Sequence, residues 1–308
     1  MFGSFFKKFI MTTIAQNTHK SNKRSRIRSE HVTHFLGRVG IYALLIIGAI
    51  LILVPFFWTI STSLKTEAQT LQFPPTWMPN PFAWENYPTA LRARPFDIYY
   101  MNSTFIAVTS TIGQVISSAI VAFGFARMRF RGRNALFLVV LSTMMIPFHV
   151  MIIPRFILFK ELGWLNTYYP LILPNFFGSA FSIFLLRQYF MTIPLDLDDA
   201  AKIDGAGYFR IFISIILPTS TAAMGVVGVF EFLESWRDFF GPLIYLTSDA
   251  KYTVPVGLNA FRTEYFTEWH LFMAASAVAM LVPLAVFFVA QKYFLGGIAL
   301  VGSGGSKG

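Results

Sequence analysis

Six long runs of apolar residues alternate along the chain with shorter polar stretches. The runs cover residues 39–61, 102–126, 135–156, 168–186, 211–230 and 271–291. A helix of about 20 residues crosses a hydrocarbon core about 30 Å thick, and lipid offers the backbone no hydrogen-bonding partner. Among Asp, Glu, Lys and Arg, only Arg155 falls within a run, at the end of the third. The pattern therefore predicts an all-α integral membrane protein with six transmembrane helices.

Composition supports this class. Of 308 residues, 55% are apolar and 13% are charged, and the mean hydropathy is +0.57. A soluble domain carries about 25% charged residues, so most of this chain is expected to face lipid or protein. Because the chain has no cysteine, disulfides, thiolate metal sites and cysteine nucleophiles are excluded. The five histidines show no metal-ligand spacing, and no metal site is expected.

The charges between the runs predict how the chain is oriented. Basic residues far outnumber acids ahead of the first run, and the connection after the second run holds four arginines and no acid: Arg127, Arg129, Arg131 and Arg133. By the positive-inside rule, both segments face the cytoplasm. Alternation then places the loop 194–210, between the fourth and fifth helices, and the C-terminus on the same side. Both termini are expected to be cytoplasmic.

Residues 1–38 form a basic N-terminal segment. Apolar residues recur at helical spacing over 2–14 with Lys7 and Lys8 among them, a pattern typical of an amphipathic helix on an anionic bilayer surface. The alternative is a disordered extension with a chance pattern. The polar basic stretch 16–28 is interpreted as an orientation signal and a lipid-headgroup contact, not as a nucleic-acid site. Residues 39–296 form the six-helix domain, and 297–308, which is rich in Gly and Ser, is predicted to be a flexible cytoplasmic tail.

The loop 194–210 has the pattern of two short helices joined by a tight turn. Asp196 is predicted to be an N-cap, with Asp199 three residues on as its capping-box partner. Ala200 and Ala201 give the first helix a small apolar face that another protein can approach closely. Gly205 permits the positive φ angle that a sharp turn needs. The alternative is an ordinary amphipathic connector whose acids complement a helix dipole.

Several blocks occur in the order found in a known family. The most specific is Asp199-Ala200-Ala201 with Gly205-Ala206 and Leu217-Pro218; weaker ones are Phe125-Ala126-Arg127, Met145-Ile146-Pro147 and Gly163-Trp164-Leu165-Asn166-Thr167. On these blocks, residues 39–297 resemble the permease subunit of carbohydrate ABC importers of the maltose type. The resemblance implies a bacterial or archaeal cytoplasmic membrane. It also implies several partners: a second permease subunit, two copies of a cytoplasmic ATPase, an extracytoplasmic solute-binding protein and a carbohydrate substrate.

The resemblance also implies roles for individual residues. The chain itself would be no enzyme and would hold no cofactor, because the partner ATPase would bind ATP and Mg²⁺. The loop would dock into a cleft of that ATPase through Asp199, Ala200, Ala201, Asp204, Gly205 and Ala206. The family usually has Glu where this chain has Asp199, so the carboxylate has a shorter reach here. Lys307 would contact the ATPase pair from the tail, although its separation from Gly302 is longer than usual.

A second block, Trp236 to Pro242, resembles the family's Trp-Asn-Glu/Asp-Phe block, with Arg237 in place of Asn. One interpretation is that Trp236, Asp238 and Phe239 line the translocation path, where aromatic rings suit the faces of sugars. The other is that the aromatic residues anchor a helix end at the membrane interface.

Three other classes are weighed against the importer. An ion-driven secondary transporter would need intramembrane acids, which the six runs lack; His149 has no partner there for a proton relay. A polytopic membrane enzyme would need a nucleophile–base cluster, and none is evident. A membrane scaffold is the weakest alternative. The pattern does not identify the sugar.

Overall fold

The computed structural model describes residues 37–262 and 267–303, and the side chains of these residues as far as Lys292. Within those ranges the regular elements are helices, apart from one antiparallel bridge between Arg262 and Thr267. The predicted amphipathic helix over 2–14 and the predicted contact Lys307 lie outside the described residues. The all-α class is confirmed.

The chain forms two compact units, residues 1–58 and 59–308. The described part of the first unit belongs to the helix Gly37–Ser63, whose most apolar window has a mean hydropathy of 2.7 and no buried residue. Its apolar side chains are therefore open to lipid or to another subunit, as the first apolar run predicts.

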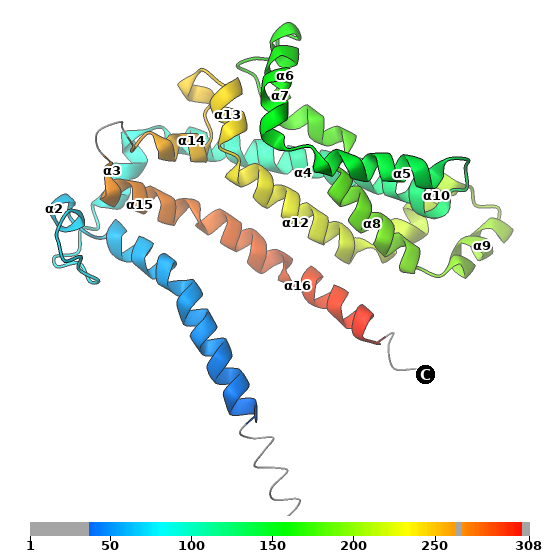
Figure 1. Cartoon of the computed structure of the whole chain (residues 1–308), viewed down its shortest axis with the longest axis horizontal. Helices are drawn as coiled ribbons and strands as arrows, with labels where there is room; N and C mark the ends of the chain where they lie inside the picture. Colours follow the sequence, from blue (N-terminus) through cyan, green and yellow to red (C-terminus); the bar gives the residue numbers. More distant parts are fainter. Residues whose placement is uncertain (1–36, 263–266, 304–308) are drawn as a thin grey trace, which may run out of the picture. The chain divides into compact units, whose positions relative to one another are not determined.

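The second unit holds the remaining elements (Figure 1). In chain order they are α2 (Glu67–Thr70), α3 (Asn86–Ala93), α4 (Phe96–Arg127), α5 (Arg133–Ser142), η1 (Thr143–Met145), α6 (Phe148–Glu161), α7 (Tyr169–Ile172), η2 (Leu173–Phe177), α8 (Ala180–Thr192), α9 (Leu195–Ile203), α10 (Tyr208–Ile211), the π-helical η3 (Phe212–Ile216), α11 (Leu217–Thr219), α12 (Thr221–Arg237), α13 (Phe240–Tyr245), η4 (Asp249–Lys251), α14 (Val254–Asn259), α15 (Trp269–Ala279) and α16 (Leu281–Ser303).

Within the described ranges, four helical segments are long and apolar enough to cross a membrane: Gly37–Ser63, Phe96–Arg127, Tyr169–Thr192 and Trp269–Lys292. Two further spans would each consist of a bent pair of helices, so the total lies between four and six. Every predicted apolar run coincides with one of these segments. The number six itself stays a prediction.

The third predicted run is not one straight helix. Arg133–Met145 and Phe148–Glu161 meet at 96°. Ile146 is extended, with ψ at 115°, because the ring of Pro147 disfavours helical backbone in the residue before it. Arg155, placed by the sequence at the end of a span, lies inside α6 instead.

The fifth predicted run is also bent, by 77° between Tyr208–Thr219 and Thr221–Arg237. The bend follows Pro218, whose ring removes one helix hydrogen bond and so allows a kink. The predicted end at residue 230 is wrong, because α12 continues to Arg237 and includes Glu231 and Glu234. Glutamate and arginine are good helix formers, and Glu234 pairs with Arg237 one turn on.

Helix α4 is the central element of the second unit and packs against both α8 and α12. Each end of α4 lies in its own apolar core. Ala122 and Phe123 join Leu186, Phe190 and Ile216 in one core cluster. At the other end, Phe96 and Tyr99 join a second core cluster, whose other members include Phe232, Trp236, Phe261 and Ala274. The two ends of α4 are therefore held by two separate apolar cores.

At the C-terminal end of the chain, α16 runs to Ser303, past the predicted start of the tail at residue 297.

Candidate functional site

The loop 194–210 forms two short helices, α9 and α10, joined by a turn. Gly205 has φ at +80°, the left-handed conformation that the sequence predicts for it. The turn is closed by hydrogen bonds from the Gly205 N–H to the Lys202 carbonyl at 3.0 Å and from the Ala206 N–H to the Ala201 carbonyl at 2.8 Å. The predicted N-cap is wrong: α9 starts at Leu195 behind Pro194, and Asp196 lies in the first turn, where its charge still complements the helix dipole.

The predicted docking residues divide between two faces of this hairpin. Asp199, Ala200, Asp204 and Gly205 are exposed, whereas Ala201 and Ala206 pack against the first core cluster. The exposed face also carries two large apolar side chains that the sequence reading missed. Ile203 is 88% exposed and Phe209 is 78% exposed. We define the docking face as the five exposed residues Asp199, Ala200, Ile203, Asp204 and Phe209, three of them apolar and two acidic.

Asp199 is ionised on this face. Its carboxylate accepts a hydrogen bond from the Lys202 ammonium at 2.9 Å. This hydrogen bond and the charge of Lys202 hold the pKa of Asp199 below its usual value. Because both side chains are well exposed, the pair leaves the carboxylate free to exchange Lys202 for a basic group on another protein.

The neighbouring acid, Asp198, has a different role. Its carboxylate lies 3.4 Å from Arg127 Nε, and the two side chains are only 6% and 2% exposed. Arg127 also donates a hydrogen bond to the Ile193 carbonyl at 2.8 Å, just before α9 begins. Arg127 ends α4, so this buried ion pair fixes the hairpin to the central helix. The sequence offered a signal in two adjacent aspartates, but only the fold distinguishes the buried one from the exposed one.

A pocket of about 600 Å³ lies toward the other end of α4. It is lined by Ser103 and Ile106 of α4, which are separated from Arg127 by roughly 30–36 Å of helix at about 1.5 Å per residue. Helix α6 adds aromatic and basic side chains, and α12 adds acids. The further lining comes from α7, η2, residues 238–242, Tyr245 and Thr253.

Two of the three predicted path residues line this pocket, Asp238 and Phe239. The third, Trp236, is 5% exposed, belongs to the second core cluster and stacks on Phe232 with ring centroids 6.0 Å apart. His149 also lines the pocket, with its ring 6.4 Å from that of Phe240. Trp236 therefore lies in the protein core and not in the pocket, and the path interpretation stays a prediction for Asp238 and Phe239.

The sequence reading missed a polar stripe on α12. Glu231, Glu234, Ser235 and Asp238 recur at i, i+3, i+4 and i+7, and all four line the pocket. This is the spacing of one helix face. The sequence contains this polar spacing, but it was not recognised as helical because the fifth run was ended at residue 230, just before the first acid.

One turn of the pocket wall depends on a glycine. The Asp238 carboxylate accepts a hydrogen bond from the Gly241 N–H at 3.1 Å. A Cβ atom on Gly241 would overlap this carboxylate and the Leu171 side chain. The close approach of Asp238 to the backbone therefore requires glycine here.

Asn166 joins two loops beside the pocket. Its amide donates to Ser248 Oγ at 2.7 Å and accepts from the Thr247 and Ser248 N–H groups at 3.2 and 3.1 Å. Its backbone N–H donates to the carbonyl of Tyr245, a pocket residue, at 2.7 Å. Asn166 has φ at +55°, which asparagine tolerates better than most residues.

Replacing Asn166 with glycine is expected to lower the free energy of unfolding by about 0.5–1.5 kcal/mol, the usual net contribution of a hydrogen bond whose partners stay partly open to water. Glycine retains the positive φ, so the loss reports the side chain. Asn166→Ala should cost more, because it adds backbone strain. Thermal unfolding in detergent measures both, and equal stability of wild type and Asn166→Gly would contradict the role given to the amide.

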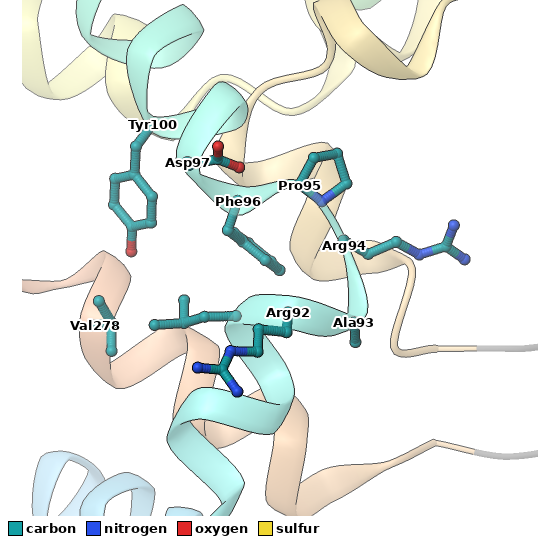
Figure 2. Close-up of a pocket in the computed structure, with 9 residues that line it drawn as sticks. Arg92, Ala93, Arg94, Pro95, Phe96, Asp97, Tyr100 and Val278 are labelled. Carbon is teal, nitrogen blue, oxygen red and sulfur yellow. The ribbon is translucent and has the colours of Figure 1, made fainter.

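A second hollow, of about 860 Å³, lies where α3 turns into α4. Figure 2 shows Tyr100 and Val278 on one side of it and the Arg94 side chain projecting away. The lining is mostly apolar, and neither the docking face nor the α12 stripe takes part in it. We assign no role to this hollow.

Comparison with known proteins identifies the family. The sequence model of the protein family described as "binding-protein-dependent transport system inner membrane component" matches residues 114–299. A probable ABC transporter permease protein of Pyrococcus horikoshii is 35% identical over 251 residues, covering 80% of this chain and 90% of that protein. The sn-glycerol-3-phosphate transport system permease protein UgpE of Yersinia enterocolitica is 33% identical, covering 83% and 94%. The arabinooligosaccharides transport system permease protein AraQ of Bacillus subtilis is 31% identical, covering 88% and 96%.

Solved structures show the same fold. A chain of a bacterial ABC transporter involved in the import of the acidic polysaccharide alginate has a TM-score of 0.73 at 24% identity, covering 85% of this chain and 97% of that one. A chain of a bacterial alginate ABC transporter, in complex with an alginate pentasaccharide-bound periplasmic protein, has a TM-score of 0.60 at 15% identity, covering 82% and 92%. Together with the match over residues 114–299, the sequence identities show that this chain belongs to the family of inner-membrane components of binding-protein-dependent transport systems, the permeases of ABC importers.

Proposed function

We propose that this chain is the membrane-spanning subunit of an ATP-driven, binding-protein-dependent carbohydrate importer. The observation that carries the proposal is the placement of two different sites at opposite ends of α4. One end holds the docking face, fixed to Arg127 by Asp198, and the other end holds the pocket lined by Asp238 and Phe239. A relative named for arabinooligosaccharides and a structural neighbour that imports alginate support a carbohydrate as the solute.

In this proposal the docking face binds a cytoplasmic ATPase, two copies of which hold ATP and Mg²⁺. A second permease subunit covers apolar faces that this chain leaves exposed, and an extracytoplasmic solute-binding protein delivers the sugar. Both termini are cytoplasmic, and Lys307 contacts the ATPase pair. ATP has a higher affinity for the closed ATPase dimer, and that difference shifts the permease between its inward-open and outward-open states.

The sequence argument against an ion-driven transporter was that the apolar runs contain no acids, but α12 contains Glu231 and Glu234. The argument against it is now that this chain belongs to the ABC importer permeases. In vesicles, we expect solute uptake to require the ATPase and to cease without ATP. Uptake that persisted with an ion gradient alone would favour the secondary transporter.

The docking assignment is tested by Asp199→Lys, which reverses a charge on the docking face. We expect the variant to lose most of its co-purifying ATPase in mild detergent, because the new lysine would repel the basic group that Asp199 is proposed to meet. Asp97→Lys is the matched control, since Asp97 is an exposed aspartate in the first turn of α4, at the opposite end of that helix from Arg127 and the docking face. Equal retention of the ATPase by Asp199→Lys and the wild type would overturn the assignment.

A further inference from the structure

The charges around the pocket are unbalanced. Glu231, Glu234 and Asp238 contribute three carboxylates, whereas Arg155 and Arg237 contribute two guanidinium groups. Arg237 pairs with Glu234 one helical turn away, so these two charges cancel locally. Two carboxylates, Glu231 and Asp238, then face the single cation Arg155.

Arg155 does not neutralise either acid. Among the described residues, no ion pair within 4.0 Å joins Arg155 to Glu231 or Asp238. Asp238 is held by neutral backbone N–H groups, those of Phe240 and Gly241, which orient its carboxylate and bring no counter-charge. Glu231 is half-buried, and no side-chain hydrogen bond to it is found in the described part of the chain. The pocket is therefore negative on its α12 side.

The remaining lining suits a polyhydroxylated solute. Ser103, Asn175 and Ser235 line the pocket with neutral polar side chains, which can exchange hydrogen bonds with solute hydroxyls. The rings of Phe148, Phe239 and Phe240 add apolar surface beside these polar groups. Carboxylates accept hydrogen bonds from neutral hydroxyls and repel solute carboxylates or phosphates.

We propose that this pocket admits neutral, polyhydroxylated solutes and excludes anionic ones, with Glu231 as the specificity-determining residue. The inference deepens the proposed function, because it takes the pocket to lie on the solute path. It separates this chain from a structural neighbour whose solute is an acidic polysaccharide and from a relative named for a phosphorylated one.

The absence of cysteine makes a direct test possible. Ser235→Cys places one thiol of this chain in the pocket, and Ala250→Cys places one on the exposed short helix η4 outside it. Each variant, in its assembled complex, is treated with anionic, cationic and neutral methanethiosulfonates of similar size. The thiolate attacks the reagent's sulfenyl sulfur, forms a mixed disulfide and releases methanesulfinate. Mass spectrometry of this chain follows the rate.

The ratio of cationic to anionic rates is expected to be about tenfold or more higher at Ser235→Cys than at Ala250→Cys, because a charged cleft concentrates counter-ions and repels co-ions. Adding Glu231→Gln to Ser235→Cys should lower the ratio of cationic to anionic rates severalfold. Glu161→Gln is the matched control, because Glu161 ends α6 outside the pocket lining, and it should leave the ratio unchanged.

Equal ratios at the two positions, or no effect of Glu231→Gln, would overturn the inference, as would a thiol that even the neutral reagent cannot reach. Asn175→Cys offers a second, half-buried position in the same pocket if Ser235→Cys fails to assemble. ATPase retention measured on the same preparations separates the two proposals. A chain that binds no ATPase but shows the charge ratio refutes the importer role and retains the selective pocket.

Discussion

Asp198→Ala is expected to destabilise the protein by about 3–5 kcal/mol, the cost of leaving a buried charge without its partner. Asp198 and Arg127 are almost fully buried, and Arg127 Nε lies 3.4 Å from this carboxylate with no hydrogen-bond partner among the described residues. Without Asp198, the guanidinium would retain one hydrogen bond, to the Ile193 carbonyl, and no counter-charge. Thermal unfolding of the purified chain in detergent measures the loss.

Two variants identify the cause. Asp196→Ala removes an exposed aspartate from the first turn of the same helix and should cost less than about 1 kcal/mol. The double variant Arg127→Met, Asp198→Leu removes both charges and should recover most of the stability, because apolar residues of similar volume often replace buried ion pairs without loss. A double variant as unstable as Asp198→Ala would show that the cost lies in packing and not in the unpaired charge.

Gly205→Pro is expected to abolish ATPase binding while the apolar helices still insert. Proline fixes φ near −65°, whereas Gly205 has φ at +80°, and proline also removes the N–H that donates to Lys202. The turn between α9 and α10 cannot form, so Asp199 and Phe209 no longer share one face. Co-purification of the ATPase from membranes, with the amount of inserted chain measured in parallel, reports the result.

Glycine at a neighbouring position supplies the control. Gly207 has φ at −75° and free space around its Cβ position, so Gly207→Ala should retain the ATPase. Gly205→Ala should be intermediate, because left-handed backbone costs an L-residue about 1–2 kcal/mol and the space around Gly205 is also free. Full ATPase retention by Gly205→Pro would mean that the hairpin is not the docking element.

The sequence predicted the helical class and the two-helix turn because both depend on local properties. Long apolar runs must be helical in lipid, and a left-handed turn favours Gly205 regardless of the rest of the fold. The bend at Pro147 was not predicted, because a proline within an apolar run either kinks a helix or ends it, and packing decides which. The end of α12 was misplaced, because an acid near the membrane surface is compatible with both a helix and a loop.

The site was harder to predict for the same reason. Asp198 and Asp199 are residues of the same type and are adjacent in sequence. Asp198 is nevertheless buried against Arg127, whereas Asp199 is exposed beside Lys202. Trp236 and Phe239 belong to one block, but the helix turns the tryptophan into the core and the chain then leaves the helix toward the pocket. These outcomes depend on which side of a helix meets a neighbour, which spacing alone does not specify.

Helix α4 carries Ser103 and Ile106 at the pocket and Arg127 at the ion pair within one continuous helix of 32 residues. Tilting a rigid rod of this length by about 5° about one end displaces the other by about 4 Å, at a rise of about 1.5 Å per residue. A modest push on α9 would thus widen or narrow the distant cavity mechanically, with no relay of side-chain rearrangements between them. The stiffness of α4 would then determine how much of the α9 movement reaches the cavity. A substitution that makes the middle of α4 flexible would lower the amount of solute transported per ATP hydrolysed, although it changes neither end of the helix.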